Sequence, residues 1–222
     1  GYAKIALESV GIALVSALCT MIIGVMVIYF PKWNRLRFLK GSAKVATLGY
    51  AIPGAVLAIG VMIPTLQIDR WLAQLNWDSI NGGAVFLLNG TLIILVYAYI
   101  IRFLAVGFKP LQASQLKLGQ TLSESSSTLG KNTVKTFFKI DFPLLKTGML
   151  SAIILVFVDI MKELPLTLIL KPYDVNTLAV KAYEYASDEL IMESALPSLT
   201  IIAAGLIPII FFNKFLLNDS QN

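Results

Sequence analysis

Long runs without charged side chains constrain the fold of this chain more than any other feature of its sequence. A bilayer core about 30 Å thick is crossed by roughly 20 apolar residues in helical conformation. Four runs of that length carry no Asp, Glu, Lys or Arg: residues 9–30, 45–68, 79–101 and 194–213. Hydrophobic residues make up 57% of the 222 residues and the mean hydropathy is +0.77, well above the range of soluble domains. The chain is therefore predicted to be an all-α integral membrane protein.

A fifth apolar run, residues 147–170, differs from the others because its second half holds three charged residues. Asp159, Lys162 and Glu163 interrupt it, and Pro165 follows them. Ionisable groups inside a membrane span are costly and usually face a cavity or one another. We therefore expect about five transmembrane helices, of which the fourth does more than anchor the chain.

The first run could instead be a secretory signal, because Lys4 precedes it. It is too long for that, and it ends in Tyr29-Phe30-Pro31 rather than in the small residues that suit cleavage. We therefore interpret it as a span. The chain begins with Gly1 rather than Met, which is compatible with the later part of a longer polypeptide.

Basic residues are unequally distributed between the connecting segments. Short loops that are rich in Lys and Arg are retained on the cytoplasmic side of the membrane. The segments after the first and third runs are rich in them: Lys32, Arg35, Arg37, Lys40, Lys44, Arg102, Lys109, Lys117, Lys131, Lys135, Lys139 and Lys146. The other connections, which include Asp69, carry mainly acids, so we expect an external N-terminus and a cytoplasmic C-terminus. This topology and contact with anionic lipid account for the net charge of +5 without a nucleic-acid partner.

The longest polar stretch, residues 123–143, lies between the third and fourth spans and therefore on the cytoplasmic side. Thr121 and Glu124 fit a capping box, which predicts a short helix that begins there. Gly130 suits the end of that helix, and Pro143 suits the first turn of the next one. The stretch is predicted to form a helix, a turn and a second helix before the fourth span.

Three apolar residues of this stretch, Val134, Phe137 and Phe138, share one face at helical spacing. Two explanations remain open. The phenylalanines either pack against the protein's own membrane helices or dip into the lipid headgroups, or they insert into a groove of a partner.

The same stretch resembles the EAA loop of ABC-transporter permeases that work with an extracytoplasmic binding protein. The family pattern is E-A-A, three residues, G, nine residues, I-x-L-P. This sequence has Glu124-Ser125-Ser126, three residues, Gly130, nine residues and Ile140-Asp141-Phe142-Pro143. Serines replace the two alanines and Phe142 replaces the leucine, so the small and apolar characters of these positions are kept.

This resemblance implies that residues 113–146 form a cytoplasmic coupling loop whose helix sits in a cleft of an ATP-hydrolysing subunit. Glu124 is then a structural cap rather than a catalytic acid, and the chain itself is not an enzyme. The residues implied in the contact are Glu124, Ser125, Ser126, Gly130, Val134, Phe137, Phe138, Ile140 and Pro143.

Three further segments resemble the ferric-iron branch of these permeases. They are YAIPGAVLAIGVM at residues 50–62, KELPLTLILKP at 162–172 and TLAVKAYEYASDELIMESALP at 177–197. In that branch the permease is often a fused duplication, and residues 1–222 resemble its second half as a single transmembrane domain. Permeases for thiamine, polyamines, sulfate or phosphonates share similar segments, so these substrates remain alternatives.

The resemblance also implies partners at a bacterial inner membrane. These are two ABC ATPase subunits that carry ATP and Mg, a second permease half, fused or separate, and a periplasmic or lipoprotein substrate-binding protein. ATP binding would close the ATPase pair and swing the spans from an inward-open to an outward-open state.

The charged residues of the fourth run are candidates for the transport path. On a helix Asp159, Lys162 and Glu163 share one face, so Lys162 can neutralise either acid and leave about one net negative charge. Together with Pro165 they would form a gate or lining element for a cationic cargo. The alternative is an ion pair that closes on itself near the outer headgroups, with Lys162 reaching toward water.

The outer segment 177–196 carries apolar residues at helical intervals and is predicted to form a helix at the outer surface. Its acids are candidates for docking the binding protein, or they form a solvated acidic face. They are Glu184, Asp188, Glu189 and Glu193.

The sequence lacks the parts of an ATP site and of a tight transition-metal site. Gly130-Lys131-Asn132 has neither the earlier glycine nor the hydroxyl residue of a P-loop, so energy must come from a partner. There is no histidine, and the one cysteine, Cys19, lies within the first run. No bound cofactor and no permanent metal site are therefore expected in this chain. A secondary transporter driven by an ion gradient and a non-transporting membrane scaffold are the rival classes, although no inverted repeat is visible.

Overall fold

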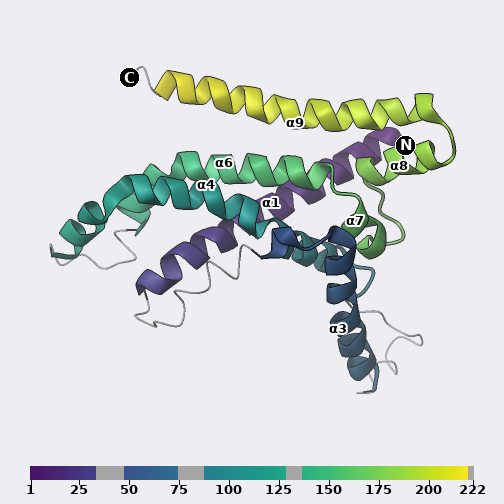
Figure 1. The fold of residues 1–222 in the computed structure, drawn as a ribbon, viewed down its shortest axis with the longest axis horizontal. Coiled ribbons are helices and arrows are strands. Elements are labelled where there is room, and N and C mark those ends of the chain that lie inside the picture. Colours follow the sequence, from purple (N-terminus) through teal and green to yellow (C-terminus); the bar gives the residue numbers. More distant parts are fainter. Residues whose placement is uncertain (34–47, 75–87, 129–136, 220–222) are drawn as a thin grey trace.

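The computed structural model describes residues 1–33, 48–74, 88–128 and 137–219, and every regular element within them is helical (Figure 1). The helices, in chain order, are α1 Tyr2–Trp33, α3 Gly54–Gln74, α4 Leu92–Thr128, α6 Phe142–Met161, α7 Pro165–Leu170, α8 Leu178–Ser187 and α9 Ile191–Asp219. A 3-10 turn, Gly49–Ala51, precedes α3, and a π-helical turn, Phe137–Asp141, precedes α6. Helices α1, α3, α4, α6 and α9 are long and apolar enough to cross a membrane. The predicted all-α membrane fold is therefore confirmed.

Helices α1, α4 and α6 pack against one another and form the centre of the molecule (Figure 1). Their facing surfaces meet in a large apolar cluster, in which Leu95 of α4 and Val156 of α6 are fully buried. A second cluster lies on the same three helices and includes Tyr29 of α1 and Leu111 of α4. These three helices therefore supply the core to which the other elements attach.

Two helix pairs attach to this centre. Helix α3 packs mainly on α7 and projects away from the centre, whereas α9 packs on α8 and runs along α6 (Figure 1). Only 11% of the apolar window of α9 is buried within the described residues, compared with 44% for α4. An apolar helix surface of this kind suits contact with lipid or with another membrane helix.

The third long helix does not coincide with the charge-free run at residues 79–101. Helix α4 begins only at Leu92 and continues through Arg102 to Thr128. Arg102 therefore lies inside the candidate span Leu92–Lys117 and not in a loop that follows the span, as the sequence predicted. A charged residue does not end a helix when its side chain has a partner, and Arg102 has one.

The other candidate spans are Tyr2–Tyr29, Gly54–Ala73, Phe142–Met161 and Ile191–Lys214.

A hydrogen-bonded turn precedes the start of α4. Asp69 is buried and accepts hydrogen bonds from the backbone N–H groups of Leu88 and Asn89, both at 3.0 Å. Gly90 follows with a φ of 73°, a left-handed conformation that glycine adopts without steric cost. Asp69, which was predicted to lie in an outer loop, is thus part of α3 and holds the turn that leads into α4.

The helix predicted to begin at Thr121 is not a separate element. Helix α4 is continuous through this position, so the backbone N–H groups there already have helical partners and no capping box is needed. The predicted coupling loop, residues 113–146, is therefore partly helical. Its first part continues α4, residues 129–136 lie outside the described residues, and α6 begins at Phe142.

Two other predicted helices are interrupted. The fourth run, residues 147–170, divides into α6 and α7, because Pro165 has no N–H for the helical ladder and disfavours a helix at the preceding residue. The outer helix predicted over residues 177–196 divides into α8 and α9 at a turn where Glu189 has a φ of 62°. Both breaks place charged residues at helix ends.

Candidate functional site

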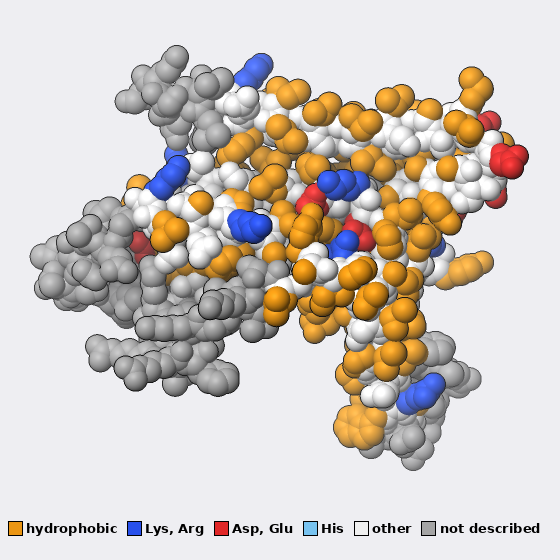
Figure 2. Space-filling model, viewed as in Figure 1, with side chains coloured by type: hydrophobic (Ala, Val, Ile, Leu, Met, Phe, Trp, Pro, Cys, Tyr) orange, Lys and Arg blue, Asp and Glu red, His pale blue; other side chains and the backbone are white. Residues whose placement is uncertain are grey.

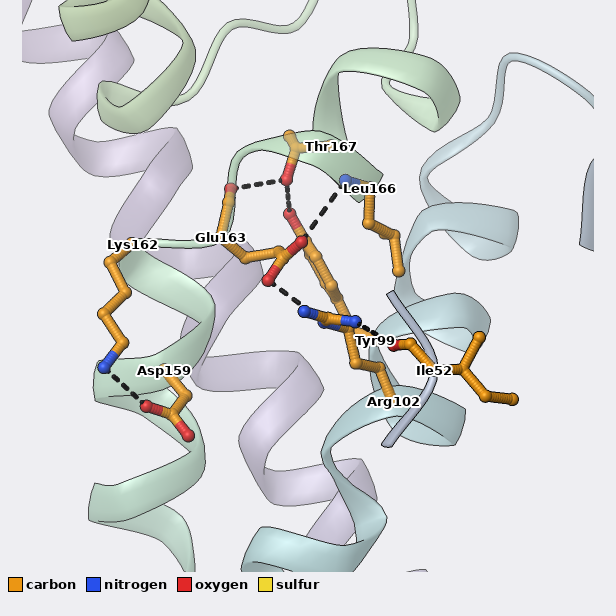
Figure 3. Close-up of polar contacts among 8 residues, drawn as sticks. All are labelled: Ile52, Tyr99, Arg102, Asp159, Lys162, Glu163, Leu166 and Thr167. Atoms are coloured by element: carbon orange, nitrogen blue, oxygen red, sulfur yellow. Dashed lines mark hydrogen bonds and ion pairs between the residues drawn. The ribbon is translucent and has the colours of Figure 1, made fainter. Parts of the chain in front are cut away.

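The break between α6 and α7 is organised by Glu163 (Figure 3). Helix α6 ends at Met161, and α7 begins at Pro165. Glu163 Oε1 accepts a hydrogen bond from the Leu166 backbone N–H at 3.3 Å, and the Glu163 carbonyl accepts one from the Thr167 hydroxyl at 2.7 Å. A carboxylate is favourable at a helix N-terminus, where backbone N–H groups lack helical partners. Glu163 therefore caps α7 instead of continuing α6.

Arg102 of α4 binds the other oxygen of the same carboxylate. Its Nε lies 3.1 Å from Glu163 Oε2, and its Nη1 donates to the Ile52 carbonyl at 2.7 Å (Figure 3). The Arg102 and Glu163 side chains are 16% and 8% exposed. One turn before Arg102, the buried hydroxyls of Tyr99 and Thr167 are 2.6 Å apart. These contacts join α4, the α6–α7 break and the segment that precedes α3.

Two glycines allow the segment before α3 to approach this junction. A Cβ atom on Gly54 would lie 2.6 Å from Glu163 Oε1, and one on Gly49 would collide with the backbone carbonyl of Ile101. Any larger residue would push the segment away from α4. The glycines are therefore part of the local structure that brings the Ile52 carbonyl within reach of Arg102.

Lys162 pairs with Asp159 and not with Glu163. Its Nζ lies 2.9 Å from Asp159 Oδ1, one helical turn away at the end of α6 (Figure 3). The predicted net negative charge on this face is therefore wrong, because Arg102 neutralises Glu163 and Lys162 neutralises Asp159. Arg102 was missed as a partner because it lies 61 residues from Glu163. The one available signal was its position directly after an apolar run.

The Asp159 side chain also borders a groove between α4 and α6. The groove has a volume of about 430 Å³, and its lining includes Lys109 and Ala113 of α4, Leu155 and Asp159 of α6, and Tyr50. Figure 2 shows basic and acidic side chains grouped in the middle of this otherwise largely apolar face. Charged groups along membrane-spanning helices are costly in lipid. The groove is therefore the part of the described surface best suited to water or a polar solute.

The predicted coupling residues are only partly described. Gly130 and Val134 lie outside the described residues, and for four others the backbone is described but not the side chain: Glu124, Ser125, Ser126 and Ile140. The structure therefore does not bring the predicted coupling residues together into one described surface.

The two phenylalanines of the π-helical turn lie in different surroundings. Phe137 is buried, and its ring meets Tyr29 of α1 edge to face at a centroid distance of 4.7 Å. Phe138 is 63% exposed, beside the exposed ring of Phe142 at 6.4 Å. Pro143 lies in the first turn of α6, where its missing N–H is no loss. Phe137 thus packs on the protein's own helices, whereas the exposed Phe138 is compatible with both contact with lipid headgroups and insertion into a partner.

The four acids that were predicted to face outward lie at the α8–α9 corner. Glu184 is in α8, Glu193 is in the first turn of α9, and Asp188 and Glu189 lie between them. Lys181 donates to Glu184 at 3.0 Å, and this hydrogen bond raises the pKa of the Lys181 ammonium above its usual value. All four residues are at least partly open to solvent. The geometry is compatible with both a docking surface and a solvated face.

Metal ligands are not concentrated anywhere in the part of the chain that the structure describes. No group of three or more His, Cys, Asp or Glu side chains there could hold a metal ion. The carboxylates of Asp159 and Glu163 are each bound to a basic side chain. A passing solute would meet them only by competing with those partners.

The chain is similar to ferric-iron transport permeases, although no family model matches it. Fe(3+)-transport system permease protein FbpB 2 of Haemophilus influenzae is 25% identical over 166 residues, which are 75% of this chain and 30% of the relative. Ferric transport system permease protein FbpB of Actinobacillus pleuropneumoniae is 24% identical over 208 residues, which are 93% of this chain and 28% of the relative. The chain thus spans less than a third of the length of these relatives. The resemblance to ferric-iron permeases is confirmed, at modest identity.

Proposed function

We propose that the chain is the transmembrane part of a permease subunit in an ATP-driven ABC importer, where it forms part of the path for ferric iron delivered by an extracytoplasmic binding protein. The observation that carries this proposal is the similarity of 93% of the chain to a ferric transport permease. The EAA-type spacing of residues 124–143 supports the ABC class separately. The chain would act as a transport subunit and not as an enzyme.

The proposed setting is a bacterial inner membrane. The five candidate spans support multi-pass insertion, and the distribution of Lys and Arg favours an external N-terminus with the coupling loop and C-terminus in the cytoplasm. The proposed partners are two ATPase subunits, which carry ATP and Mg, a second permease half and the binding protein. The relatives are more than three times as long as the matched segment, which supports a second half within the same polypeptide.

In this proposal, movement enters through the segment that precedes α6. Phe137 belongs to an apolar cluster with Tyr29 of α1, Leu111 of α4 and Leu145 of α6. A partner that displaces this segment would therefore act on all three central helices at once. Phe138 is exposed beside this anchor and would supply apolar contact area for the ATPase.

Helix α6 connects that contact to the candidate transport path. It begins at Phe142, beside the proposed coupling segment, and Asp159 and Lys162 lie at its other end. The break that Glu163 and Pro165 form follows directly. A displacement at the ATPase contact would reach the charged groove through a single helix. Alternating access requires that the inward-open and outward-open states bind ATP and cargo differently.

Iron uptake tests the proposed function. Radiolabelled ferric iron would be measured in iron-starved cells that carry the wild-type gene, a deletion, Gly130→Trp or Gly130→Ala. We expect the deletion and Gly130→Trp to abolish uptake, because the indole would block the proposed ATPase contact, and Gly130→Ala to retain most of it at equal membrane insertion. If the deletion leaves iron uptake unchanged, the ferric assignment is wrong, and thiamine, polyamine, sulfate and phosphonate uptake should be screened.

Co-purification tests the coupling role. Phe138→Ala is expected to lower recovery of the ATPase subunit severalfold without affecting insertion. Leu144→Ala is the matched control, because Leu144 is another exposed apolar residue and is the third residue of α6. Equal recovery of the ATPase with wild type, Phe138→Ala and Gly130→Trp would contradict the coupling role.

A further inference from the structure

Two grooves of similar size lie along α4, and they differ in chemistry. One has a volume of about 420 Å³ and a lining that includes the apolar residues Val15, Ile93 and Val96. The other is the α4–α6 groove of about 430 Å³, whose lining includes Lys109 and Asp159. Lipid chains suit the first groove because it offers them apolar contacts. They do not suit the second, where a charged group in hydrocarbon would be costly.

The charges of the α4–α6 groove lie within candidate spans, so they need water or a partner. Lys109 is inside Leu92–Lys117, and Asp159 is inside Phe142–Met161. Asp159 has Lys162 as its partner, whereas no ion pair to a described residue is found for Lys109. The charged residues of the lining are Lys109 and Asp159. Lys162 is not part of the lining, but its Nζ lies 2.9 Å from Asp159 Oδ1 and neutralises that carboxylate, which leaves the positive charge of Lys109 uncompensated.

This charge balance selects among forms of the cargo. A bare ferric ion has three positive charges and would be repelled by a groove of positive charge whose one carboxylate is already paired. An iron complex whose oxygen ligands make it an anion would be attracted. The ammonium group of Lys109 can donate charge-assisted hydrogen bonds to such ligands, and the Tyr50 hydroxyl can donate or accept.

We propose that the α4–α6 groove is a water-filled part of the translocation path and that it takes iron as an anionic, oxygen-ligated ferric complex. The identity of the cargo rests on the proposed function, whereas the water-filled groove rests on the charges alone. The proposal replaces the cationic cargo expected from the sequence. It also separates Glu163 from the path, because Arg102 already holds that carboxylate.

Thiol labelling tests whether the groove is wet. The full-length protein would be studied in membrane vesicles after Cys19 and any other cysteine have been replaced. Ala113→Cys and Leu155→Cys probe the groove, and Ile93→Cys in the apolar groove is the matched control, since Ile93 is 70% exposed but faces no charge in the lining. Membrane-impermeant methanethiosulfonates are expected to modify both groove cysteines at least tenfold faster than Ile93→Cys. Equal rates at all three positions would overturn the proposal.

The charge of the reagent tests the sign of the field. Ala113 lies one helical turn after Lys109, about 6 Å away, where one unit charge in water changes the rate of a charged reagent roughly threefold. At Ala113→Cys we therefore expect Lys109→Gln to slow the anionic ethylsulfonate reagent and to speed the cationic trimethylammonium reagent, and Lys109→Arg to change neither. Unchanged rates in Lys109→Gln would overturn the assignment of a positive groove.

Protection tests the cargo. Ferric citrate is expected to slow labelling of Ala113→Cys severalfold, whereas potassium citrate at equal concentration is not. Equal labelling with and without ferric citrate would overturn the ferric part. The labelling rates are measured without transport. The expected labelling pattern can therefore be absent while deletion still abolishes iron uptake, which would contradict the groove proposal but not the proposed function. The opposite combination is that the groove cysteines are labelled as expected but deletion leaves iron uptake unchanged. That result would support the water-filled groove and exclude iron as the cargo.

Discussion

Lys162 and Glu163 are neighbours in the sequence, yet their charges lie in different surroundings. Glu163 is 8% exposed and binds Arg102 of another helix, which is 16% exposed. Lys162 is 64% exposed and binds Asp159 of its own helix, which is 17% exposed, so only the basic member of this second pair is open to water. A buried charge that loses its partner is left without compensation, but an exposed charge that loses its partner exchanges it for water. The difference indicates that the first pair holds the fold together and that the second is free to exchange with a solute.

Removing the buried charge is expected to have the largest effect. Glu163→Gln keeps the size of the side chain but leaves the Arg102 guanidinium without its counterion, so we expect a loss of about 3–5 kcal/mol in the free energy of unfolding. Thermal unfolding of the purified full-length protein would record this as a lower melting temperature. The double variant Arg102→Met/Glu163→Leu has no buried charge and should lose less. If Glu163→Gln loses less than about 1 kcal/mol in the free energy of unfolding, the Arg102–Glu163 pair contributes no more than a solvent-exposed ion pair does.

Crowding the buried pair is expected to have the second largest effect. In Gly54→Ala the new Cβ would lie 2.6 Å from Glu163 Oε1 and 3.2 Å from Arg102 Cζ. We expect a loss of about 1–3 kcal/mol, as for other overpacked sites. Gly60→Ala is the matched control on the same helix, because a Cβ there meets nothing within 4 Å. Equal melting temperatures for the two variants would mean that the junction accommodates a methyl group.

Removing the acid of the exposed pair is expected to matter little for stability. In Asp159→Asn, Lys162 remains in contact with water, so the free energy of unfolding should change by less than about 1 kcal/mol. The same thermal unfolding measurement as for Glu163→Gln gives a direct comparison. A loss as large as that of Glu163→Gln would erase the distinction between the two pairs.

The Lys181–Glu184 pair outside the spans is expected to have the smallest effect, below about 0.5 kcal/mol. The Glu184 carboxylate raises the pKa of Lys181 in the folded state. A raised pKa contributes stability below the unfolded value of about 10.4, and that contribution is lost as pH rises through the folded value. The melting temperatures of wild type and Lys181→Gln should therefore differ slightly at pH 8 and converge as the pH rises through the folded-state pKa of Lys181. Divergence at high pH would contradict this origin.

The five spans could be predicted from the sequence because charge-free length is a local property, but helix ends depend on contacts between helices. Helix α4 continues through Arg102 because Glu163 neutralises it, and these residues lie 61 positions apart. The predicted helix start at Thr121 was wrong for a related reason, since a capping pattern has no effect inside a helix that is already formed.

The candidate site was predictable where it depends on spacing within one helix. The i,i+3 contact of Asp159 and Lys162 follows from helical periodicity. The different burial of Phe137 and Phe138 does not, because it depends on where Tyr29 of α1 lies. The groove that contains Lys109 likewise requires the packing of α4 on α6.

The distinction between the two pairs is tested most directly by comparing Lys162→Gln with Glu163→Gln in iron uptake per inserted molecule and in melting temperature. We expect Glu163→Gln to lower the melting temperature strongly. Lys162→Gln should lower the melting temperature much less but lose most of its uptake, because the Asp159 charge would then offset the positive charge of Lys109 in the groove. Wild-type uptake by Lys162→Gln at equal insertion, or the same drop in melting temperature in both variants, would contradict the separation of fold and path between these neighbouring residues.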